Sequence, residues 1–382
     1  MVHKAYRFRI YPTKEQELLI AKTLGCCRYV YNRYLHQRNE HYRLTGKSFS
    51  YKACSADLTR HKQDVPWLKE PDSTALQSSL KNLDTAFKNF FSGTAQYPRF
   101  KSKRHLVQSY TAKNNNHSIR VAENRVLVNK LGWIRFAKSR EVTGRILSAT
   151  LRRNASGTYH ISILVETEVL ELPKTGKVCG VDVGLKTLAV TSSGLTYLNP
   201  KHFKTLEDKL AREQRKLSRR YQQAKRDKKS LSDAKNYQKQ RVKVARIQET
   251  IWNRRNDTLH KVSSHLVKNH DLIGMEDLQV ANMVKNPTLS KTISDASWGI
   301  LQRMVAYKAA WYGKELVLVG KTFPSSQLCS ACGMKNPGVK DLSLRTWVCE
   351  ACGAHHDRDV NASHNIEKEA IRLGTAGTAG IA

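Results

Sequence analysis

The chain has 382 residues, of which 66 are lysine or arginine and 32 are aspartate or glutamate, so its formal net charge is +34. This length allows two or three domains, and the positive excess is too large to be neutralised within the fold, so we expect a polyanionic partner. No stretch approaches the roughly 18 apolar residues of a membrane span, and the first residues lack the apolar core of a secretory signal, so we expect an intracellular protein with no membrane partner.

The N-terminal part predicts one strand followed by helices. In residues 2–10 apolar and basic residues alternate, which is the period of a half-buried strand. From residue 13 to residue 105 the apolar residues recur at three and four positions, which is the spacing of helices. This stretch ends in a basic run and is predicted to be a helical insertion.

The next segment, residues 106–172, is expected to form short antiparallel strands. Turns that contain asparagine or glycine separate its period-two runs. Together with residues 1–12 they predict a small β-barrel. The runs lie at residues 126–128, 133–136, 146–151 and 159–165.

Two carboxylates interrupt apolar strands further along the chain. Asp182 lies within the apolar segment 178–184, and Glu276 ends a short strand that begins at Leu272. A carboxylate in a buried strand is costly unless it has a partner. At a sheet edge, the functional partner that we expect for such a group is a divalent cation.

A strongly basic region separates these two strands. Residues 204–246 contain sixteen lysines and arginines and five aspartates and glutamates. Leucines at helical spacing mark a narrow apolar seam, which predicts a helical pair over residues 204–268. In most proteins such charge runs are solvated helix faces. In a chain with this net charge, contact with nucleic acid is the favoured interpretation.

Four of the eight cysteines form two C-x-x-C pairs, and the other four follow no pattern. Cys329 and Cys332 are followed, after sixteen residues, by Cys349 and Cys352. The matched spacing favours a zinc site with four thiolate ligands over unrelated thiols or a redox pair. All four positions would be filled by protein, so this zinc is expected to be structural.

The last helix is expected to begin beside a third carboxylate, either Asp357 or Asp359. An aspartate before a helix is more often a plain N-cap. In this order, however, it would join Asp182 and Glu276 at one edge of an RNase H-like sheet. Such a group can hold two Mg²⁺ or Mn²⁺ ions about 4 Å apart for in-line hydrolysis of a phosphodiester bond. The residues therefore predict a metal-dependent nuclease.

The order of these motifs resembles the TnpB family, the transposon-encoded relatives of the type V CRISPR effectors. The motifs are YRFRIYPTKEQ, FKNFF, YPRFKSKR, GVDVGLKTLAV, GMEDL, the two cysteine pairs and DRDVNASHNI, and they cover nearly the whole chain. The resemblance implies a multidomain protein with α/β and β-barrel parts. An RNase H-like (RuvC) nuclease domain with an inserted zinc ribbon would be preceded by a wedge-like β-barrel with an inserted helical recognition domain.

The domain boundaries that we expect follow the elements above. From Leu373 onward the chain has small residues and little to bury, so the tail is predicted to be disordered. The expected domains are the barrel at 1–12 and 106–172, the helical insertion at 13–105, the nuclease at 173–328 and 353–372, the zinc ribbon at 329–352 and the tail at 373–382.

The resemblance implies a catalytic triad of Asp182, Glu276 and Asp359, which would hold the Mg²⁺ or Mn²⁺ ions. Asp359 is preferred over Asp357 because the family pattern places the ligand in D-x-N-A. Asn361 would then orient Asp359.

The resemblance also implies the function and its partners. The chain would be an RNA-guided DNA endonuclease that cleaves double-stranded DNA beside a short flanking motif, contacted by Gln77 and Lys81. The guide RNA would come from the transposon end. We expect a monomeric ribonucleoprotein in the cytoplasm of a prokaryotic cell, at the nucleoid when on target. Two alternatives stay open: a transposase or resolvase that cuts without RNA, and an RNA-guided repressor that does not cut.

Overall fold

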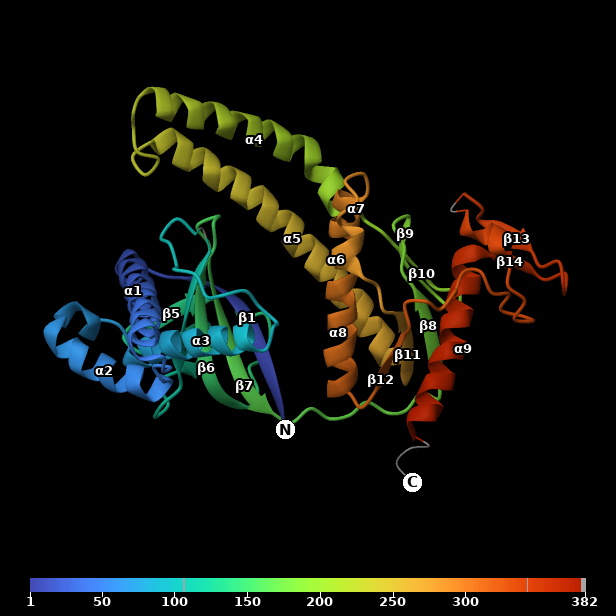
Figure 1. The fold of residues 1–382 in the computed structure, drawn as a ribbon, viewed down its shortest axis with the longest axis horizontal. Coiled ribbons are helices and arrows are strands. Elements are labelled where there is room, and N and C mark those ends of the chain that lie inside the picture. Colours follow the sequence, from blue (N-terminus) through green and yellow to red (C-terminus); the bar gives the residue numbers. More distant parts are fainter. Residues whose placement is uncertain (106, 342, 379–382) are drawn as a thin grey trace. The chain divides into compact units, whose positions relative to one another are not determined.

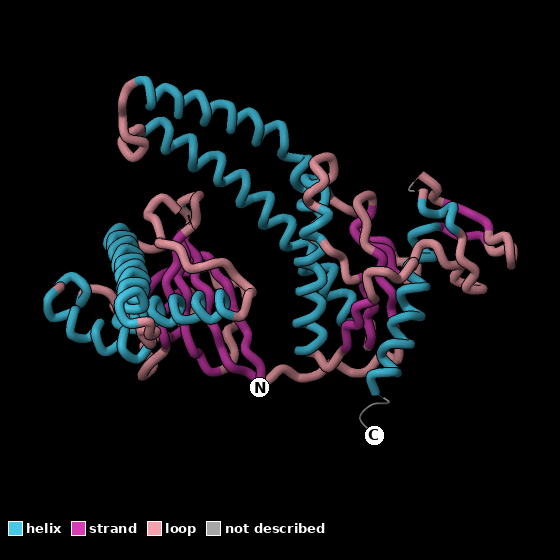
Figure 2. Tube along the Cα trace, in the orientation of Figure 1, coloured by secondary structure: helices cyan, strands magenta, loops and turns pink. Residues whose placement is uncertain are grey.

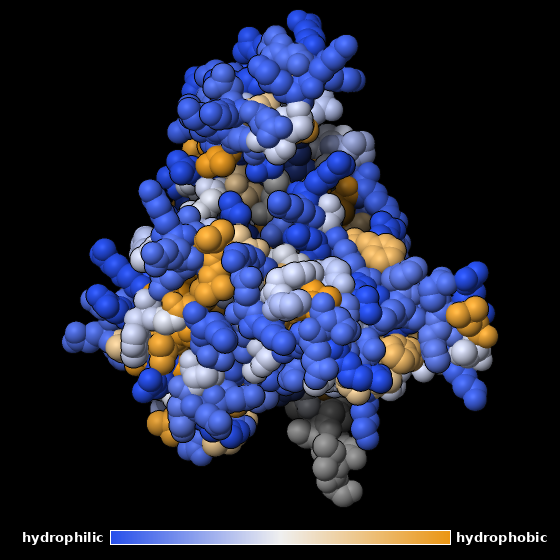
Figure 3. All heavy atoms as spheres, turned by 90° about the vertical axis from the view of Figure 1, so that its left-hand side faces the viewer, coloured by the Kyte–Doolittle hydropathy of each residue, from blue (hydrophilic) through white to orange (hydrophobic). Residues whose placement is uncertain are grey.

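The computed structural model describes residues 1–105, 107–341 and 343–378 (Figure 1). The chain divides into two compact units, Met1–Glu168 and Val169–Ala382, and each is described here by itself. Within the described ranges, no helix is both long and apolar enough to cross a membrane. On the face of the molecule in Figure 3, hydrophilic residues predominate and apolar residues form small separate groups.

The first unit is built on a seven-stranded antiparallel sheet in the order β2-β6-β7-β1-β5-β4-β3. The N-terminal strand therefore lies between strands that come more than a hundred residues later. Among the described residues no ladder joins β2 to β3, so closure of this sheet into a barrel is not confirmed. The strands are β1 (Val2–Tyr11), β2 (Gln108–Lys113), β3 (Arg120–Val121), β4 (Arg125–Val128), β5 (Gly132–Phe136), β6 (Arg145–Arg153) and β7 (Tyr159–Thr167).

Helices α1 (Lys14–Thr45), α2 (Tyr51–Asp64) and α3 (Ser73–Phe91) come between β1 and β2 in the chain, with a short 3₁₀ turn at Pro66–Lys69. Thr13 begins α1 with a capping box, and Gly46 ends it in the left-handed conformation. The buried faces of α1, α2 and α3 share one apolar core with the sheet.

The second unit contains a five-stranded mixed sheet in the order β10-β9-β8-β11-β12. Strand β11 is parallel to both β8 and β12, whereas β9 is antiparallel to β8 and β10. The first helix after β11 is short (α6, Val280–Met283). The strands are β8 (Val178–Asp182), β9 (Thr187–Thr191), β10 (Thr196–Leu198), β11 (Leu272–Glu276) and β12 (Glu315–Val319).

Helices cover both faces of this sheet, because its residues alternate in direction. Cys179, Val181, Ile273 and Met275 share a core with α5 (Lys235–Asn269), α7 (Ser290–Ala296) and α8 (Trp298–Trp311). The long helix α9 (Arg358–Thr378) packs against the other face. Figure 1 shows α8 and α9 on opposite sides of these strands.

A polar cluster fixes the ends of the strands far from the carboxylates. The carboxylate of Asp271, just before β11, accepts hydrogen bonds from the N–H groups of Thr175 and Gly176 and from the ammonium of Lys314. Lys314 also donates to the carbonyl of Pro173 at 2.7 Å. The bond from Lys314, and then the two backbone bonds, lower the pKa of Asp271. The starts of β8, β11 and β12 are thereby tied together.

Helix α4 (His202–Arg226) runs antiparallel to α5 as a long hairpin, which Figure 2 shows as two adjacent helices. A narrow seam of apolar side chains and a few hydrogen bonds, such as those from Gln240 to Glu213, join the two helices, so the rest of both surfaces can be basic. The seam centres on Leu210, Val244 and Ile251.

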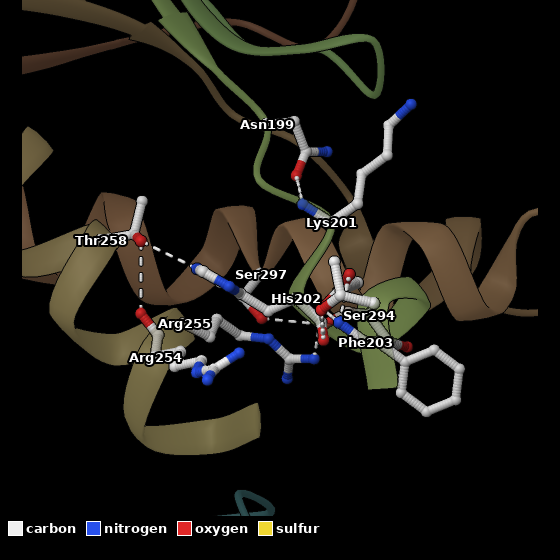
Figure 4. A network of polar contacts seen from close by, with 11 residues as sticks. Asn199, Lys201, His202, Phe203, Arg254, Arg255, Thr258, Ser294 and Ser297 are labelled. Atoms are coloured by element: carbon white, nitrogen blue, oxygen red, sulfur yellow. Dashed lines mark hydrogen bonds and ion pairs between the residues drawn. The ribbon is translucent and has the colours of Figure 1, made fainter. Parts of the chain in front are cut away.

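A buried carboxylate anchors the start of this hairpin (Figure 4). Asp295 accepts hydrogen bonds from the N–H of Phe203 at 3.0 Å and from the guanidinium of Arg255 at 2.6 Å. The ring of His202 lies 2.9 Å from the hydroxyl of Thr258. These contacts attach the first turn of α4 to α5 and α7.

The C-terminal segment corrects one prediction. Helix α9 continues to Thr378, so residues 373–378 are helical, whereas the sequence predicted disorder from Leu373. Gly374 packs close to β11, since a β-carbon there would lie 3.1 Å from a methyl group of Leu272. Contact with the sheet therefore extends the helix beyond the point where side chains become small. Residues 379–382 lie outside the described residues.

Candidate carboxylate site and cysteine cluster

Strand geometry brings two of the predicted site residues to the same edge. Asp182 ends β8 and Glu276 ends β11, and these strands are parallel neighbours. Their register pairs Val181 with Met275, so the two carboxylates follow at the same level. Asp359 lies in the first turn of α9. The hydrogen bonding and electrostatics of these three groups define the candidate site.

Two glycines set how closely α9 approaches the sheet. Gly180 and Gly274 are cross-strand partners, and each precedes its strand's carboxylate by two residues. A β-carbon at Gly180 would lie 1.9 Å from the carbonyl oxygen of Ser363, and one at Gly274 would lie 2.7 Å from the β-carbon of Ala370. Helix α9 therefore rests directly on the strand backbones, and this depth positions Asp359.

The three carboxylates interact electrostatically. Burial, followed by the negative charges of Glu276 and Asp359, raises the pKa of Asp182 well above its ordinary value. The positive charge of Arg358 and the N–H of Val183 oppose this rise without cancelling it. Like charges that are held together in this way favour either a bound proton or a bound cation.

Two further side chains contact the carboxylates, and the sequence did not point to either. The hydroxyl of Ser325 lies 2.5 Å from Oε1 of Glu276 and donates to it. The guanidinium of Arg345 lies 3.5 Å from Asp359. Ser325 is buried, and its carbonyl accepts a hydrogen bond from Asn365 of α9. Helix α9 thus also helps to position a partner of Glu276.

Asp357 and Asp359 have different environments. Oδ1 of Asp357 accepts hydrogen bonds from the N–H groups of Asp359 and Val360, both at 3.0 Å, which is the role of an N-terminal cap. The charge of Asp359 instead acts on Asp182. These contacts favour Asp359 over Asp357 as the third member of the carboxylate group.

Asn361 corrects a second prediction, because it was expected to orient Asp359. Its side chain is buried and bonds the backbone on both sides of Cys329 instead. It accepts from the N–H of Ser330 at 2.8 Å and donates to the carbonyl of Leu328 at 2.7 Å. Asn361 therefore joins α9 to the cysteine cluster.

The four predicted cysteines come together, with sulfur atoms that all lie within 4.8 Å of one another. The sulfurs of Cys329 and Cys352 are 3.6 Å apart, as are those of Cys332 and Cys349. Sulfurs around a tetrahedral zinc ion, with Zn–S bonds of about 2.3 Å, would be separated by about 3.8 Å. The spacing fits such an ion. Within the described residues, these four thiols are the group of candidate metal ligands that lies this close together.

The two halves of the cluster have the same local fold. In each pair the N–H of the glycine that follows the second cysteine donates to the carbonyl of the first at 2.8 Å. Both glycines, Gly333 and Gly353, have a positive φ. A residue with a β-carbon would be strained there, so each C-x-x-C-G segment closes the same turn and directs its two thiols inward.

The thiols differ in acidity. Burial raises the pKa of Cys329, but hydrogen bonds from the N–H of Cys332, the ring of His356 and the N–H of Ala331 outweigh it and lower this pKa to about 6. For Cys352 the N–H of Ala354 lowers the pKa, but hydrogen bonds with the neighbouring thiols raise it to about 12. One thiolate therefore forms readily, and a cation would displace the remaining protons.

Relatives with similar sequences match almost the entire chain. A protein of Streptomyces pristinaespiralis named "Putative RNA-guided DNA endonuclease" is 37% identical over 96% of this chain and 89% of its own length. One of Escherichia coli (strain K12) with the same name and the suffix InsQ is 33% identical over 95% of this chain and 91% of its own. A family model described as "Probable transposase" matches residues 160–287. This chain belongs to the TnpB family.

Two further family models match other parts of this TnpB chain. "Cas12f1-like, TNB domain" matches residues 298–366, which include the four cysteines and Asp359. "Helix-turn-helix domain" matches residues 1–47, which form one strand and a single continuous helix here. A structure titled "Cryo-EM structure of the Cas12f1-sgRNA-target DNA complex" aligns over 96% of this chain and 99% of that chain, with 14% identity and a TM-score of 0.37.

The two residues that the TnpB resemblance assigned to the DNA motif are on α3 of the first unit, whereas the carboxylates and the cysteines belong to the second unit. Gln77 and Lys81 are exposed and one turn apart. The ammonium of Lys81 lies 3.6 Å from Asp84 and 5.1 Å from the centroid of the Tyr51 ring. Both side chains are accessible to a ligand.

Proposed function

We propose that this protein is an RNA-guided DNA endonuclease encoded by a transposon, which cleaves target DNA next to a short flanking motif by two-metal-ion phosphodiester hydrolysis. The observation that carries this proposal is the electrostatic coupling of Asp182 to Glu276 and Asp359, which come from two parallel strands and one helix. In this proposal the five-stranded sheet with α9 is an RNase H-like (RuvC) domain, residues 329–352 are a zinc ribbon, and the first unit is a wedge-like part with a helical recognition insertion.

The three carboxylates would hold Mg²⁺ or Mn²⁺. Bound there, such ions supply Lewis acidity that activates water and stabilises the leaving oxygen in an in-line attack on phosphate. The fit rests on donor chemistry, since carboxylate oxygens are the ligands that these ions prefer and three of them already repel one another. Ser325 would orient Glu276 through its hydroxyl, and Asp359 would be held in place by the docking of α9.

The nucleic-acid partners would be a guide RNA from the transposon end and double-stranded target DNA. A net charge of +34 exceeds what one cleaved strand needs, whereas a structured RNA with a target duplex would use it. The α4–α5 hairpin offers a basic surface that its own apolar seam leaves uncovered. We propose a monomeric ribonucleoprotein that acts in the cytoplasm.

Sequencing of co-purifying nucleic acid, combined with a cleavage assay, tests this function. We expect one abundant non-coding RNA, and cleavage that requires it together with Mg²⁺ or Mn²⁺ and stops with EDTA. Activity without RNA would indicate a transposase or resolvase. RNA-dependent binding without cleavage by the wild-type protein would indicate a repressor.

The cysteine cluster is predicted to contain structural zinc. Cys329→Ser should release the metal and lower cleavage activity, because Asn361 couples this cluster to the helix that carries Asp359. Metal analysis and thermal unfolding measure both effects. Cys54→Ser, at a buried cysteine of the first unit, is the control and should keep the zinc. Less than about half an equivalent of zinc in fully active protein would contradict this prediction.

Gln77 and Lys81 are proposed to read the flanking motif. A glutamine can pair bidentately with adenine, and a lysine can donate to base acceptors or hold a phosphate. Replacing both by alanine should relax the motif requirement while cleavage still depends on the guide. A cleavage assay with randomised flanking bases measures the preference. If the preference is unchanged, these residues are an ordinary polar helix face.

A further inference from the structure

The first unit contains a pocket of about 360 Å³ between α1, α3, β2 and the segment that precedes β2. Pockets that bind small molecules typically measure about 300–1,000 Å³. Several of the lining side chains can donate hydrogen bonds or carry positive charge. They include Arg28, Asn82, Lys101, His105 and Gln108.

The charge of this pocket is uncompensated. Arg28 and Lys101 are cations, and the described lining contains no aspartate or glutamate. The ammonium of Lys101 lies 4.0 Å from the centroid of the Tyr31 ring, and within the described residues it has no ion pair. The negative charge of Asp72 acts on Tyr110, which lines the pocket. The carboxylate of Asp72, however, accepts hydrogen bonds from the N–H and the hydroxyl of Thr74 at the start of α3. An anion would therefore find two available cations.

The surroundings of Lys101 affect its pKa. Burial lowers the pKa of Lys101, although much of its side chain is exposed. A phosphate beside such a group would restore the pKa and gain an interaction that surface lysines do not offer.

The pocket wall is held rigidly. The side-chain amide of Asn32 donates to the carbonyl of Lys101 at 2.9 Å and accepts from its N–H at 2.7 Å. Further along, the amide of Gln108 donates to the carbonyls of Lys103 and His105, both at 3.1 Å. The described residues of this wall are thus hydrogen-bonded to α1 and to the start of β2.

A neighbouring hollow of about 550 Å³ shares Arg28 and adds Arg33. A strand with one phosphate in the first pocket could therefore place its next phosphate near Arg33. This arrangement suits a strand with successive phosphates better than a free monophosphate.

We propose that this pocket binds a single unstacked nucleotide of a nucleic-acid strand, with its phosphate between Arg28 and Lys101 and its base or sugar against Asn82 and Gln108. The amide of Asn82 and the side-chain oxygen of Gln108, whose amide nitrogen already donates within the wall, could hydrogen-bond a base edge. The neighbouring hydroxyls of Ser102 and Ser109 extend this polar wall. The nucleotide could belong to RNA or to DNA, since both carry the same phosphate. The inference relies on nucleic-acid binding but not on cleavage.

The test is ultraviolet crosslinking of the full chain with its co-purified RNA and added target DNA, followed by mass spectrometry of crosslinked peptides. We expect a crosslinked nucleotide on the peptide that contains Tyr110. Its mass distinguishes ribose from deoxyribose. A crosslink that is lost when the protein is dialysed before irradiation would show a free mononucleotide and overturn the proposal. Absence of any crosslink there in wild type, at full nucleic-acid occupancy, would also overturn it.

Matched variants test the pocket itself. Lys101→Ala removes the charge, and Asn82→Trp, at an exposed position, obstructs the space. Each should reduce the crosslink yield about tenfold, as expected for the loss of a charge-assisted hydrogen bond or of the space. Lys103→Ala removes an exposed charge from the same segment outside the pocket lining and should leave the yield unchanged. An equal loss in all three variants would mean that general charge, and not the pocket, holds the strand.

Two controls separate this proposal from the proposed function. Circular dichroism should show each variant folded, and a variant that melts early is replaced by Lys101→Gln, which keeps the stem. All crosslinking is repeated in the Asp182→Ala background, where no cutting is expected. A pocket crosslink in wild-type protein that fails to cleave target DNA would support the nucleotide site and count against the endonuclease. RNA-guided cleavage without the pocket crosslink would support the endonuclease and count against the nucleotide site.

Discussion

Replacing Asp182 with alanine should abolish cleavage of target DNA, with a loss of about a thousandfold or more, while binding of RNA and target is retained. The reason is that this carboxylate would hold metal ions worth several kcal/mol to the transition state, whereas it would not touch the nucleic-acid backbone. A cleavage assay with Mg²⁺ and a filter-binding assay measure the two effects. Loss of binding together with cleavage would make Asp182 a structural residue.

The isosteric variant Asp182→Asn gives a second readout without metal. Burial and the charges of Glu276 and Asp359 raise the pKa of Asp182 in the folded protein. Its protonated form therefore stabilises the fold below the unfolded pKa of about 4, and this contribution is lost as the pH rises through the raised folded value. In EDTA at neutral pH the variant should melt at a higher temperature than wild type, and this gain should shrink on acidification. If Asp182→Asn and wild type melted at the same temperature at every pH, the ionised Asp182 carboxylate would not destabilise the fold.

Gly180→Ala should be nearly as damaging to activity and far more damaging to stability. The new β-carbon would meet the backbone of α9 at Ser363 and Glu367, at 1.9 and 2.4 Å, and backbone atoms cannot rotate away. Overpacking of this kind costs about 3 kcal/mol or more when nothing can yield. Denaturant unfolding measures the loss, and the cleavage assay should report a displaced Asp359.

Gly299→Ala is the matched control in the same unit. This glycine lies in the first turn of α8 with no atom within 4 Å of the added carbon. Alanine favours helix by about 1 kcal/mol over glycine in a helix interior, so the variant should be as stable as wild type or more so. If Gly180→Ala unfolded and cut like this control, direct contact between α9 and the strands would not be needed.

The sequence predicted much of the fold because its signals were local. Alternation in residues 2–10 and in four runs after residue 106 predicted strands, and the structure confirms them as β1 and β4 to β7. Strands β2 and β3 were not among the predicted runs. The cysteine spacing likewise predicted a cluster, because each C-x-x-C pair closes its own turn. Both inferences depended on contacts within short stretches of chain.

What could not be predicted depends on contacts between distant segments. Ser325 reaches Glu276 from 49 residues away, and nothing in the sequence around it marks it. Asn361 was expected to orient Asp359 because of the family pattern D-x-N-A, yet its side chain forms hydrogen bonds with the loop at Cys329. The glycines two residues before Asp182 and Glu276 were a visible signal, but their meaning required the depth at which α9 docks.

The order of the docked elements has a consequence for synthesis on the ribosome. Strands β8 and β11, with Asp182 and Glu276, are complete once about 276 residues exist, whereas α9 begins only at Arg358. Before α9 is synthesised, the strand surface at Gly180 and Gly274 has no helix packed on it. The growing chain then already contains the basic α4–α5 hairpin, Asp182 and Glu276, but not yet Asp359. Under the proposed function, a nascent chain would present this surface to nucleic acid for several seconds, since translation adds about 5–20 residues per second. Through that interval it would hold the strand without being able to cut it.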